Sequence, residues 1–480
     1  MKSLLSMENL DIHQHFHYDH TNQESIIERA QLIKGKTLSY VANNSPYPQE
    51  MLNTANKGQV GNFIEKHWFG IENNSRSEPD FKEAGIELKV SPIKEKGQNS
   101  LVVKERTKIC KINYKKLVEE DWKNSHAKNK LNKILFIFYK FNRDNWNEQK
   151  ILDFKLWNLS SEELVISNEW FKTRDQVQDG DANDLSEGNY KVLAPCTSGT
   201  GRLEPQPNQD YKDAPERSFA LKQPFVNFLW NSLDISMDYE STKATLDLSL
   251  HDESFDAQVL SKINNFSGKT IGDIVNTFSI SIPKGKAAMR SIIMKLLGFQ
   301  NSQSRIKEFE QSGIEIKVIP INAESKSLYE SISFPAIKFK EFADEIWEDS
   351  TLSLQLNRIL FIPVGRNQRF VNINNRVLEK AFFWSPSDKE LEIIKKEWSN
   401  YQKIVKEGVS IEKIPMNTKK GFKEVTSLPN ESSTKIIHLR THAQGSNDRD
   451  VDSFGTSIVK HSFWLNKKFV KKLIQNSLNS

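Results

Sequence analysis

The chain contains one short segment twice. Residues 82–93 read KEAGIELKVSPI, and residues 310–321, 228 positions later, read EQSGIEIKVIPI, so that seven of the twelve positions are identical without a gap. Short apolar matches arise by chance, but a shared G-I-E-x-K-V-x-P-I rarely does. Two further pairs of segments match in the same order: 132–137 with 357–362, and 218–221 with 462–465. Three landmarks in one order predict that the chain uses one fold twice.

The length agrees with this duplication, because 480 residues exceed what one hydrophobic core usually supports. We expect a catalytic domain at 1–235, a linker rich in Ser, Asp and Asn at 236–270, and a second domain at 271–480. Helices are predicted at 24–34, 57–69, 115–131, 160–175, 286–298, 338–349 and 387–405. Strands are predicted at 85–90, 134–140, 313–318 and 359–364. The expected fold class is α/β (α+β), with a mixed sheet flanked by helices in each domain.

The composition excludes several classes of protein. The mean hydropathy of −0.59 argues against a membrane protein, and no stretch approaches the roughly 20 apolar residues that cross a bilayer. The N-terminus turns acidic and His-rich too early for a secretory signal, and two cysteines make no disulfide framework, so a cytoplasmic location is expected. The net charge of +5 is compatible with nucleic-acid binding, and equally with an ordinary solvated surface.

The repeated strand carries a pattern typical of metal-dependent chemistry. Its apolar residues alternate with Glu87 and Lys89, which therefore share the opposite face. Asp80 lies seven residues before Glu87, after a polar run, which gives the order P-D-x6-E-x-K. Two carboxylates brought together by a turn and a strand suit Mg²⁺. A neighbouring lysine can stabilise the charge of a phosphorane or help to deprotonate an attacking water.

Alone, this pattern also describes a half-buried strand with a solvated glutamate and lysine, and Glu65 on the helix 57–69 could be an ordinary surface residue. The comparison of the two copies favours chemistry in the first. Glu87 and Lys89 recur in copy two, whereas three other charged positions change. These changes are Glu65 to Ile293, Asp80 to Glu308 and Lys130 to Gln355. We infer that copy one is catalytic, while copy two binds and does not cut.

The ordered motifs resemble a known family. Residues 57–65 (KGQVGNFIE), Pro79-Asp80 and 84–89 (AGIELK) are similar to the MutH-like endonucleases, a branch of the PD-(D/E)xK nuclease superfamily. Ser125-His126 with 130–135 (KLNKIL) matches the family's next segment, and 218–222 (SFALK) matches its C-terminal recognition segment. The doubled architecture, with 193–197 reading LAPCT, resembles the Sau-type restriction endonucleases that cut at GATC.

The resemblance implies a type II restriction endonuclease that cleaves double-stranded DNA at GATC with Mg²⁺. Carried over by position, it implies metal ligation by Asp80, Glu87 and the main-chain carbonyl of Leu88, assisted by Glu65. Lys89 would be the catalytic lysine, and Lys130 would lie near the scissile phosphate. The second domain would be a silent copy that binds a further GATC site and stimulates cutting.

The DNA contacts implied by the matched segments are Ser125, His126 and Lys222. The family's Arg-Pro-Lys recognition loop reads Ala194-Pro195-Cys196 in copy one, so base contacts there are expected from Thr197, Ser198 or Arg202. Copy two keeps an arginine at this place, Arg440, followed by His442. Arginine suits guanine, although a phosphate contact without base readout is an equal alternative for Arg440.

The position of the family's methyl-sensing tyrosine is Ala220, so we expect cleavage to tolerate N6-methyladenine in GATC. One chain has one intact site, so a double-strand break needs self-association on DNA or two sequential nicks. Two other functions stay open at this point. A strand-selective nicking repair endonuclease would depend on methylation, and a DNA-binding regulator without catalysis would leave DNA whole.

Overall fold

The chain folds into two compact units, Met1–Met237 (unit 1) and Asp238–Ser480 (unit 2). A computed structural model describes residues 18–47, 58–72, 78–96, 100–142, 145–197, 201–234, 236–237, 239–242, 255–281, 288–299, 305–347, 350–368, 371–415 and 422–479. Among the helices of these ranges, none has the length and apolarity that a bilayer crossing requires.

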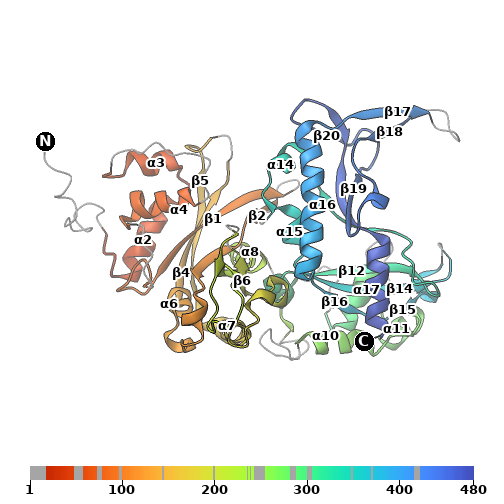
Figure 1. The fold of residues 1–480 in the computed structure, drawn as a ribbon, viewed down its shortest axis with the longest axis horizontal. Helices are drawn as coiled ribbons and strands as arrows, with labels where there is room; N and C mark the ends of the chain where they lie inside the picture. The colour runs from red at the N-terminus through yellow and green to blue at the C-terminus, as the bar shows by residue number, and fades with distance from the viewer. Residues whose placement is uncertain are drawn as a thin grey trace. The chain divides into compact units, whose positions relative to one another are not determined.

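A four-stranded mixed sheet forms the centre of unit 1. In spatial order its strands are β2 (Ser100–Val103), β1 (Glu87–Lys96), β4 (Lys133–Lys140) and β5 (Lys150–Asn158). Strands β1 and β4 run parallel, and the other two pairs are antiparallel. Helices α2 (Gln23–Ile33), α3 (Leu38–Asn43) and α4 (Gln59–Ile64) lie on one side of this sheet (Figure 1). They pack against Ile86 and Leu88, which confirms the predicted inward face of the repeated strand.

A smaller antiparallel sheet completes unit 1. Its order is β3 (Thr107–Lys111), β9 (Arg217–Leu221) and β6 (Leu193–Thr197). The flanking helices are α5 (Tyr114–Leu117), α6 (His126–Leu131), α7 (Glu163–Gln178) and α8 (Gln223–Asn231). Strand β6 therefore places the sequence LAPCT beside β9, which carries SFAL.

Unit 2 repeats this plan. Strand β12 (Ile314–Asn322) runs parallel to β14 (Arg358–Arg366), which also pairs with the short strands β15 (Val377–Leu378) and β16 (Phe382–Trp384). The second sheet has the order β13 (Ile332–Ala336), β22 (His461–Leu465) and β19 (Ile437–Thr441). Its main helices are α12 (Ala288–Leu296), α13 (Lys307–Ser312), α15 (Thr351–Gln355), α16 (Asp388–Glu407) and α17 (Lys467–Asn479). Two tandem domains of one mixed α/β fold are thus confirmed.

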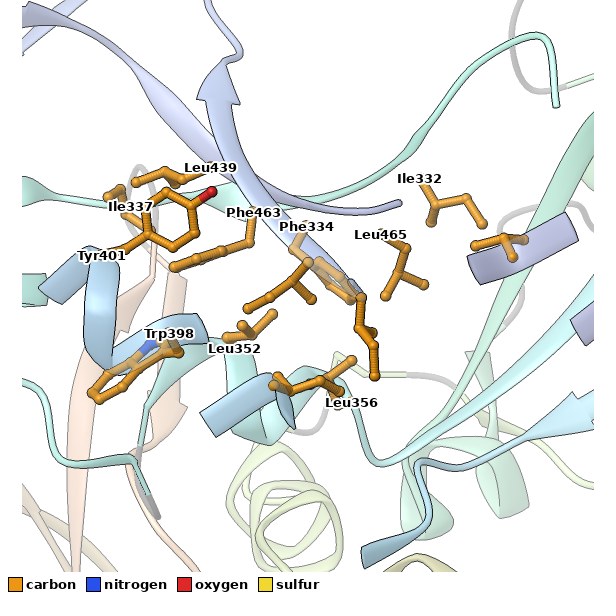
Figure 2. Close-up of a cluster of buried hydrophobic side chains, with 14 of the residues drawn as sticks. Ile332, Phe334, Ile337, Leu352, Leu356, Trp398, Tyr401, Leu439, Phe463 and Leu465 are labelled. Atoms are coloured by element: carbon orange, nitrogen blue, oxygen red, sulfur yellow. The ribbon is translucent and has the colours of Figure 1, made fainter. Parts of the chain in front are cut away.

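The core of unit 2 lies between its second sheet and the long helix α16. Figure 2 shows Trp398 and Tyr401 of α16 with Leu439 of β19 and Phe463 of β22 in one buried cluster. All four side chains are less than a tenth exposed. Burial of aromatic and aliphatic area on this scale is the main source of stability in a domain of this size.

The strand registers match the sequence repeat. Glu87 lies opposite Ile134 in the β1–β4 pair, and Glu315 lies opposite Ile359 in the β12–β14 pair. Each repeated strand is preceded by a glycine in the left-handed region, Gly85 with φ 66° and its counterpart in unit 2, Gly313, with φ 67°. Only glycine adopts this conformation without a steric cost, which explains why the repeat keeps it.

One predicted helix is wrong. The Lys-rich stretch 115–131 forms two short helices, α5 and α6, with a 3-10 turn between them. Ser125 marks this break, because its hydroxyl accepts the backbone N–H of Lys128 at the start of α6, just as Asn113 caps the start of α5. Side-chain caps of this kind begin a new helix where charge and propensity alone suggest a continuous one. The predicted helix 338–349 is also shorter, and ends at Ala343 in α14 (Phe339–Ala343).

The expected linker 236–270 also needs correction, because it contains the first helix of unit 2. Helix α10 (Phe255–Asn264) buries Phe255, Val259 and Ile263, which are spaced four residues apart on one helical face. It occupies the place that α2 has in unit 1. Lys133 of β4 donates to Gln23 of α2, and Arg358 at the equivalent strand position pairs with Asp256 of α10.

A repeated tripeptide, missed in the sequence, marks the same correspondence. Gly35-Lys36-Thr37 recurs as Gly268-Lys269-Thr270 before α3 and α11 (Ile271–Thr277), respectively. In both units the glycine N–H donates to a strand carbonyl, that of Ile151 at 2.8 Å and that of Leu378 at 2.7 Å. Both threonine side chains then cap the following helix. The duplication therefore begins at the N-terminal helices of each unit.

Candidate active site

Glu87 is the centre of a buried charged cluster in unit 1. Strand β1 holds its side chain at 1% exposure, away from the core of α2 to α4. The Lys89 ammonium lies 2.6 Å from Glu87 Oε1, and the Lys130 ammonium lies 2.9 Å from Oε1 and 3.1 Å from Oε2. A buried carboxylate requires such partners, because an unpaired charge in the interior is very costly.

Asp80 joins this cluster through the backbone of the strand. Its Oδ2 accepts the N–H of Leu88 at 2.9 Å, which fixes the carboxylate beside the start of β1. Burial raises the pKa of Asp80, and the Glu87 charge raises it further. The P-D-x6-E-x-K spacing therefore brings both carboxylates to one place, as the sequence predicts.

Glu65 belongs to the same electrostatic environment. It begins the π-helical turn η2 (Glu65–Phe69), which continues α4. Burial raises the pKa of Glu65 to about 7, and the charges of Asp80 and Glu87 add to this rise. An ideal Cβ on Gly61 would lie 3.9 Å from Glu65 Oε1, so a small residue leaves room for the carboxylate there.

Lys89 is a cation in this arrangement. Burial alone would lower its pKa, but the Glu87 and Asp80 charges outweigh that effect, and the net pKa is raised. A protonated ammonium at this position stabilises negative charge rather than accepting a proton. Of the two roles open for this lysine in the sequence, the geometry favours charge stabilisation.

The chemistry of the donors, though not their present arrangement, suits a hard divalent cation. The candidate ligands Glu65, Asp80 and Glu87 offer only oxygens, and the pKa values of Glu65 and Asp80 are raised by burial first and by the neighbouring carboxylate charges second. Within the described ranges, no three His, Cys, Asp or Glu side chains lie in an arrangement that could hold an ion. Both oxygens of Glu87 instead accept hydrogen bonds from Lys130.

The equivalent place in unit 2 is much altered. Lys317 pairs with Glu315 at 2.8 Å, but the Glu315 side chain is 42% exposed, in contrast to the buried Glu87. Ile293, the counterpart of Glu65, is fully buried in α12. Within the part of the chain that the structure describes, the buried Oε1 of Gln355, the counterpart of Lys130, has no hydrogen-bond partner. This unit keeps the strand without the charges that surround Glu87.

Two expected DNA contacts, Ser125 and Lys222, are buried and bound to other groups of the protein. Ser125 is fully buried; its hydroxyl caps α6 by accepting the Lys128 N–H at 3.1 Å, and donates to the Trp122 carbonyl. Lys222 is 3% exposed, and its ammonium donates to the carbonyls of Tyr190 and Glu187. Asn466 binds the equivalent carbonyls in unit 2, which supports a scaffold role for this position. The expectation of DNA contacts here came from the matched family segments, which do not show whether a side chain is buried.

The other expected contacts of unit 1 lie on different elements. His126 of α6 lines a small cavity of about 50 Å³ with Cys110 and Glu120, and among the described residues its buried Nε2 has no hydrogen-bond partner. Burial lowers the pKa of His126, and the charge of Lys130 lowers it further. Thr197 is half-buried at the end of β6, and Arg202 is exposed. Ser198 lies outside the described residues.

In unit 2 the expected contacts lie together on an open strand face. The Arg440 guanidinium lies 4.0 Å from the centre of the Trp464 ring. His442 donates to or accepts from Ser462 Oγ at 2.8 Å, and its ring lies 4.8 Å from that of Trp464. Trp464 was missed, although the change from SFAL to SFWL between the copies could have indicated it. Its counterpart Ala220 is fully buried.

Comparison with known protein families identifies the class to which both units are similar. Each unit contains a segment that matches the family DNA mismatch repair enzyme MutH, at residues 69–169 and 297–397. The chain thus carries two MutH-type domains, and the predicted resemblance to this family is confirmed.

Individual relatives refine the class. The chain is 29% identical over 464 residues to the type II restriction enzyme Sau3AI of Staphylococcus aureus. The aligned region covers 88% of this chain and 93% of that protein. It is also 26% identical to the DNA mismatch repair protein MutH of Haemophilus ducreyi, over 48% of this chain and 98% of that protein. The MutH protein of Actinobacillus pleuropneumoniae is 25% identical over 46% of this chain. The similarity to a type II restriction enzyme over most of both chains confirms the prediction of a type II restriction endonuclease at the level of class.

Proposed function

We propose that this chain cleaves double-stranded DNA at GATC with Mg²⁺, that unit 1 cuts, and that unit 2 binds a second GATC site without cutting. The carrying observation is the buried cluster around Glu87, which unit 1 has and unit 2 lacks. Similarity to a restriction enzyme over both units supports two domains that act in one chain.

The side chains of unit 1 would divide the work. Asp80, Glu87 and the Leu88 carbonyl, with Glu65 beside them, would hold the ion. When bound, a divalent ion supplies Lewis-acid stabilisation and a water of lowered pKa. Lys89, held as a cation by Glu87, places positive charge where the attacked phosphate gains negative charge. Lys130, which donates to both oxygens of Glu87, would lie near the same phosphate.

The matched residues of the two units test the division of labour. Asp80→Ala and Glu87→Ala should each abolish cleavage of a GATC plasmid in Mg²⁺, whereas Glu315→Ala in unit 2 should cut at close to the wild-type rate. Mapped ends of the products would locate the cuts relative to GATC, and EDTA should stop the reaction. Equal activity of wild type and Glu87→Ala would exclude unit 1 as the cutting unit.

The proposed second site has a separate test. Addition of a short GATC duplex should stimulate cleavage of a one-site plasmid, since it fills unit 2. Arg440→Ala should weaken this stimulation, because a guanidinium on an exposed strand is suited to a guanine or a phosphate. A duplex of the same length without GATC is the control. Indifference of the wild type to both duplexes would count against an effector site.

A further inference from the structure

Glu308 of unit 2 occupies the position that the metal-ligand candidate Asp80 has in unit 1, but its carboxylate oxygens already accept hydrogen bonds from the protein. Helix α13 holds it at 6% exposure, and its carboxylate accepts the hydroxyl of Ser241 and, at 2.7 Å, the backbone N–H of Thr242. Both oxygens of this carboxylate are therefore engaged by protein donors. In unit 1, Asp80 accepts instead the N–H of Leu88, a residue of the strand β1 that follows it.

The donors come from the segment at which unit 2 begins. Unit 1 ends at Met237 and unit 2 begins at Asp238. Residues 239–242, which follow, are named here the entry segment. Strand β10 (Tyr239–Glu240) pairs in parallel with β11 (Arg305–Ile306), which leads into α13. This short ladder aligns the entry segment so that Thr242, which is fully buried, reaches Glu308.

The choice of residue at this position follows from the contact. Glutamate is one methylene longer than aspartate, and so its carboxylate extends further from α13 than an aspartate would. Two charged residues of the unit 1 cluster, Glu65 and Lys130, are replaced by Ile293 and Gln355 in unit 2, so the carboxylate at position 308 has lost part of its unit 1 surroundings. A buried carboxylate that accepts charge-assisted hydrogen bonds is a strong anchor for a backbone segment.

We propose that the former metal-ligand position of unit 2 has become a docking site for the chain's own entry segment. Glu308 anchors the connection between the units, and the anchor transmits the DNA-bound state of unit 2 to this connection. The second part rests on the proposed effector function of unit 2; the first part does not.

Hydrogen exchange of the intact protein without DNA tests the anchor. In Glu308→Gln, the peptide that covers 239–242 should exchange about tenfold faster or more, since a hydrogen bond to a charged group is lost. Ser241→Ala should give a smaller increase, and the double variant should exchange no faster than Glu308→Gln alone. The matched control is Glu310→Gln, a half-exposed glutamate of the same helix, which should leave this peptide unchanged.

Exchange of the entry segment within twofold of the wild type in Glu308→Gln would overturn the anchor. If Glu308→Gln loosens all of unit 2, Ser241→Ala decides, because this hydroxyl lies outside the core: faster exchange confined to 239–242 supports the anchor, and no change overturns it.

Stimulation by a GATC duplex tests the transmitted effect. We expect the stimulation of cleavage to fall about threefold or more in Glu308→Gln, with the unstimulated rate retained. Undiminished stimulation in a variant whose entry segment is released would overturn the transmission. A wild type that no duplex stimulates would contradict the effector function, and the exchange result would still stand alone.

Discussion

At the residue scale, the informative comparison is between Lys89 and Lys317, which the repeat preserves in both units. Each pairs with the glutamate two residues before it, at 2.6 Å and 2.8 Å. The charges of Glu87, Asp80 and Glu65 raise the pKa of Lys89, and in unit 2 the position of Glu65 is occupied by the apolar Ile293. The same residue in the same strand position thus has different surroundings, and we propose a catalytic role for Lys89 alone.

Lys89→Met should therefore lower the single-turnover cleavage rate of a GATC duplex about a hundredfold to a thousandfold, the usual cost of removing one preorganised charge stabiliser. Lys317→Met should leave the rate within about threefold, since a half-exposed ion pair contributes little. Thermal melts of both variants control for folding. A similar loss of rate in both variants would show that the strand, rather than the charge, is what matters.

Glu65 predicts a pH dependence of stability in the metal-free protein. Burial, then the charges of Asp80 and Glu87, raise its pKa to about 7, while the Lys89 and Lys130 charges oppose this rise. A carboxyl whose pKa is raised on folding stabilises the fold below its unfolded pKa, near 4.5, and loses that contribution as pH rises through 7. The unfolding free energy should fall between pH 5 and pH 8, by up to about 3 kcal/mol from this group.

Glu65→Gln should flatten this dependence, because the amide is neutral throughout, and should be more stable than the wild type at pH 8. Denaturant unfolding in EDTA at both pH values measures the effect. An unchanged pH slope in Glu65→Gln would mean that other groups are responsible.

The position of Ala220 predicts tolerance of adenine methylation. Its small side chain is buried in a cluster with Tyr190, Ala194 and Cys196. Position 220 of β9 therefore offers DNA no aromatic ring that could contact a methyl group. We expect Dam-methylated and unmethylated plasmids to be cut at equal rates, as gel electrophoresis of a time course would show. Full protection by methylation would refute the expectation and return the nicking-type alternative to consideration.

At the scale of elements, one contact recurs between a long helix and the second sheet. Glu169 of α7 is buried and accepts the backbone N–H groups of Val192 and Leu193 at 3.0 and 2.7 Å. Glu397 of α16 accepts the equivalent groups of Ile436 and Ile437 at 3.2 and 3.0 Å. The carboxylates join the start of β6 or β19 to the preceding helix, and so hold the strands that carry the expected recognition residues.

Glu169→Gln should destabilise unit 1 by about 2 kcal/mol, since an amide offers one acceptor oxygen and turns its NH₂ toward the remaining donors. Glu397→Gln should have a comparable effect on unit 2. Urea unfolding followed by tryptophan fluorescence measures both. Unfolding free energies equal to the wild type would show that these glutamates are dispensable for the docking of the sheet.

The sequence predicts elements well where their signal is periodic. The alternation around Glu87 gives both the strand and its inward face, and the repeat gives the same register in unit 2. The break before Ser125 was not predictable from helical periodicity, since it depends on side-chain caps. Lys222 was assigned to DNA because a lysine in a recognition segment suggests the surface, whereas this one is buried among backbone carbonyls. The active-site cluster was found because the copies differ there, and the anchor at Glu308 was not, because its donors lie in a segment without a repeat.

At the scale of the whole molecule, the question is where the second domain begins. The Ser-, Asp- and Asn-rich composition of 236–270 suggested a linker, but α10 within it carries three buried side chains and pairs with β14 through Asp256 and Arg358. Phe255 also packs edge-on against Phe309 of α13, with ring centres 6.3 Å apart. Unit 2 as the structure divides it, from Asp238, includes these contacts.

A fragment of residues 239–480 should therefore unfold cooperatively, and a fragment of residues 271–480 should not. The shorter fragment lacks Phe255, Val259 and Ile263, whose burial contributes about 1.5–3 kcal/mol each. Their sum is comparable to the entire stability of a typical domain, about 5–15 kcal/mol, so little of the folded state would remain. Circular dichroism melts and near-ultraviolet spectra of the two fragments distinguish the cases. Equal melting of both fragments would mean that α10 contributes little to the stability of unit 2. A Val259→Ala variant of the longer fragment measures this contribution, because the change removes buried methyl groups and keeps the helix.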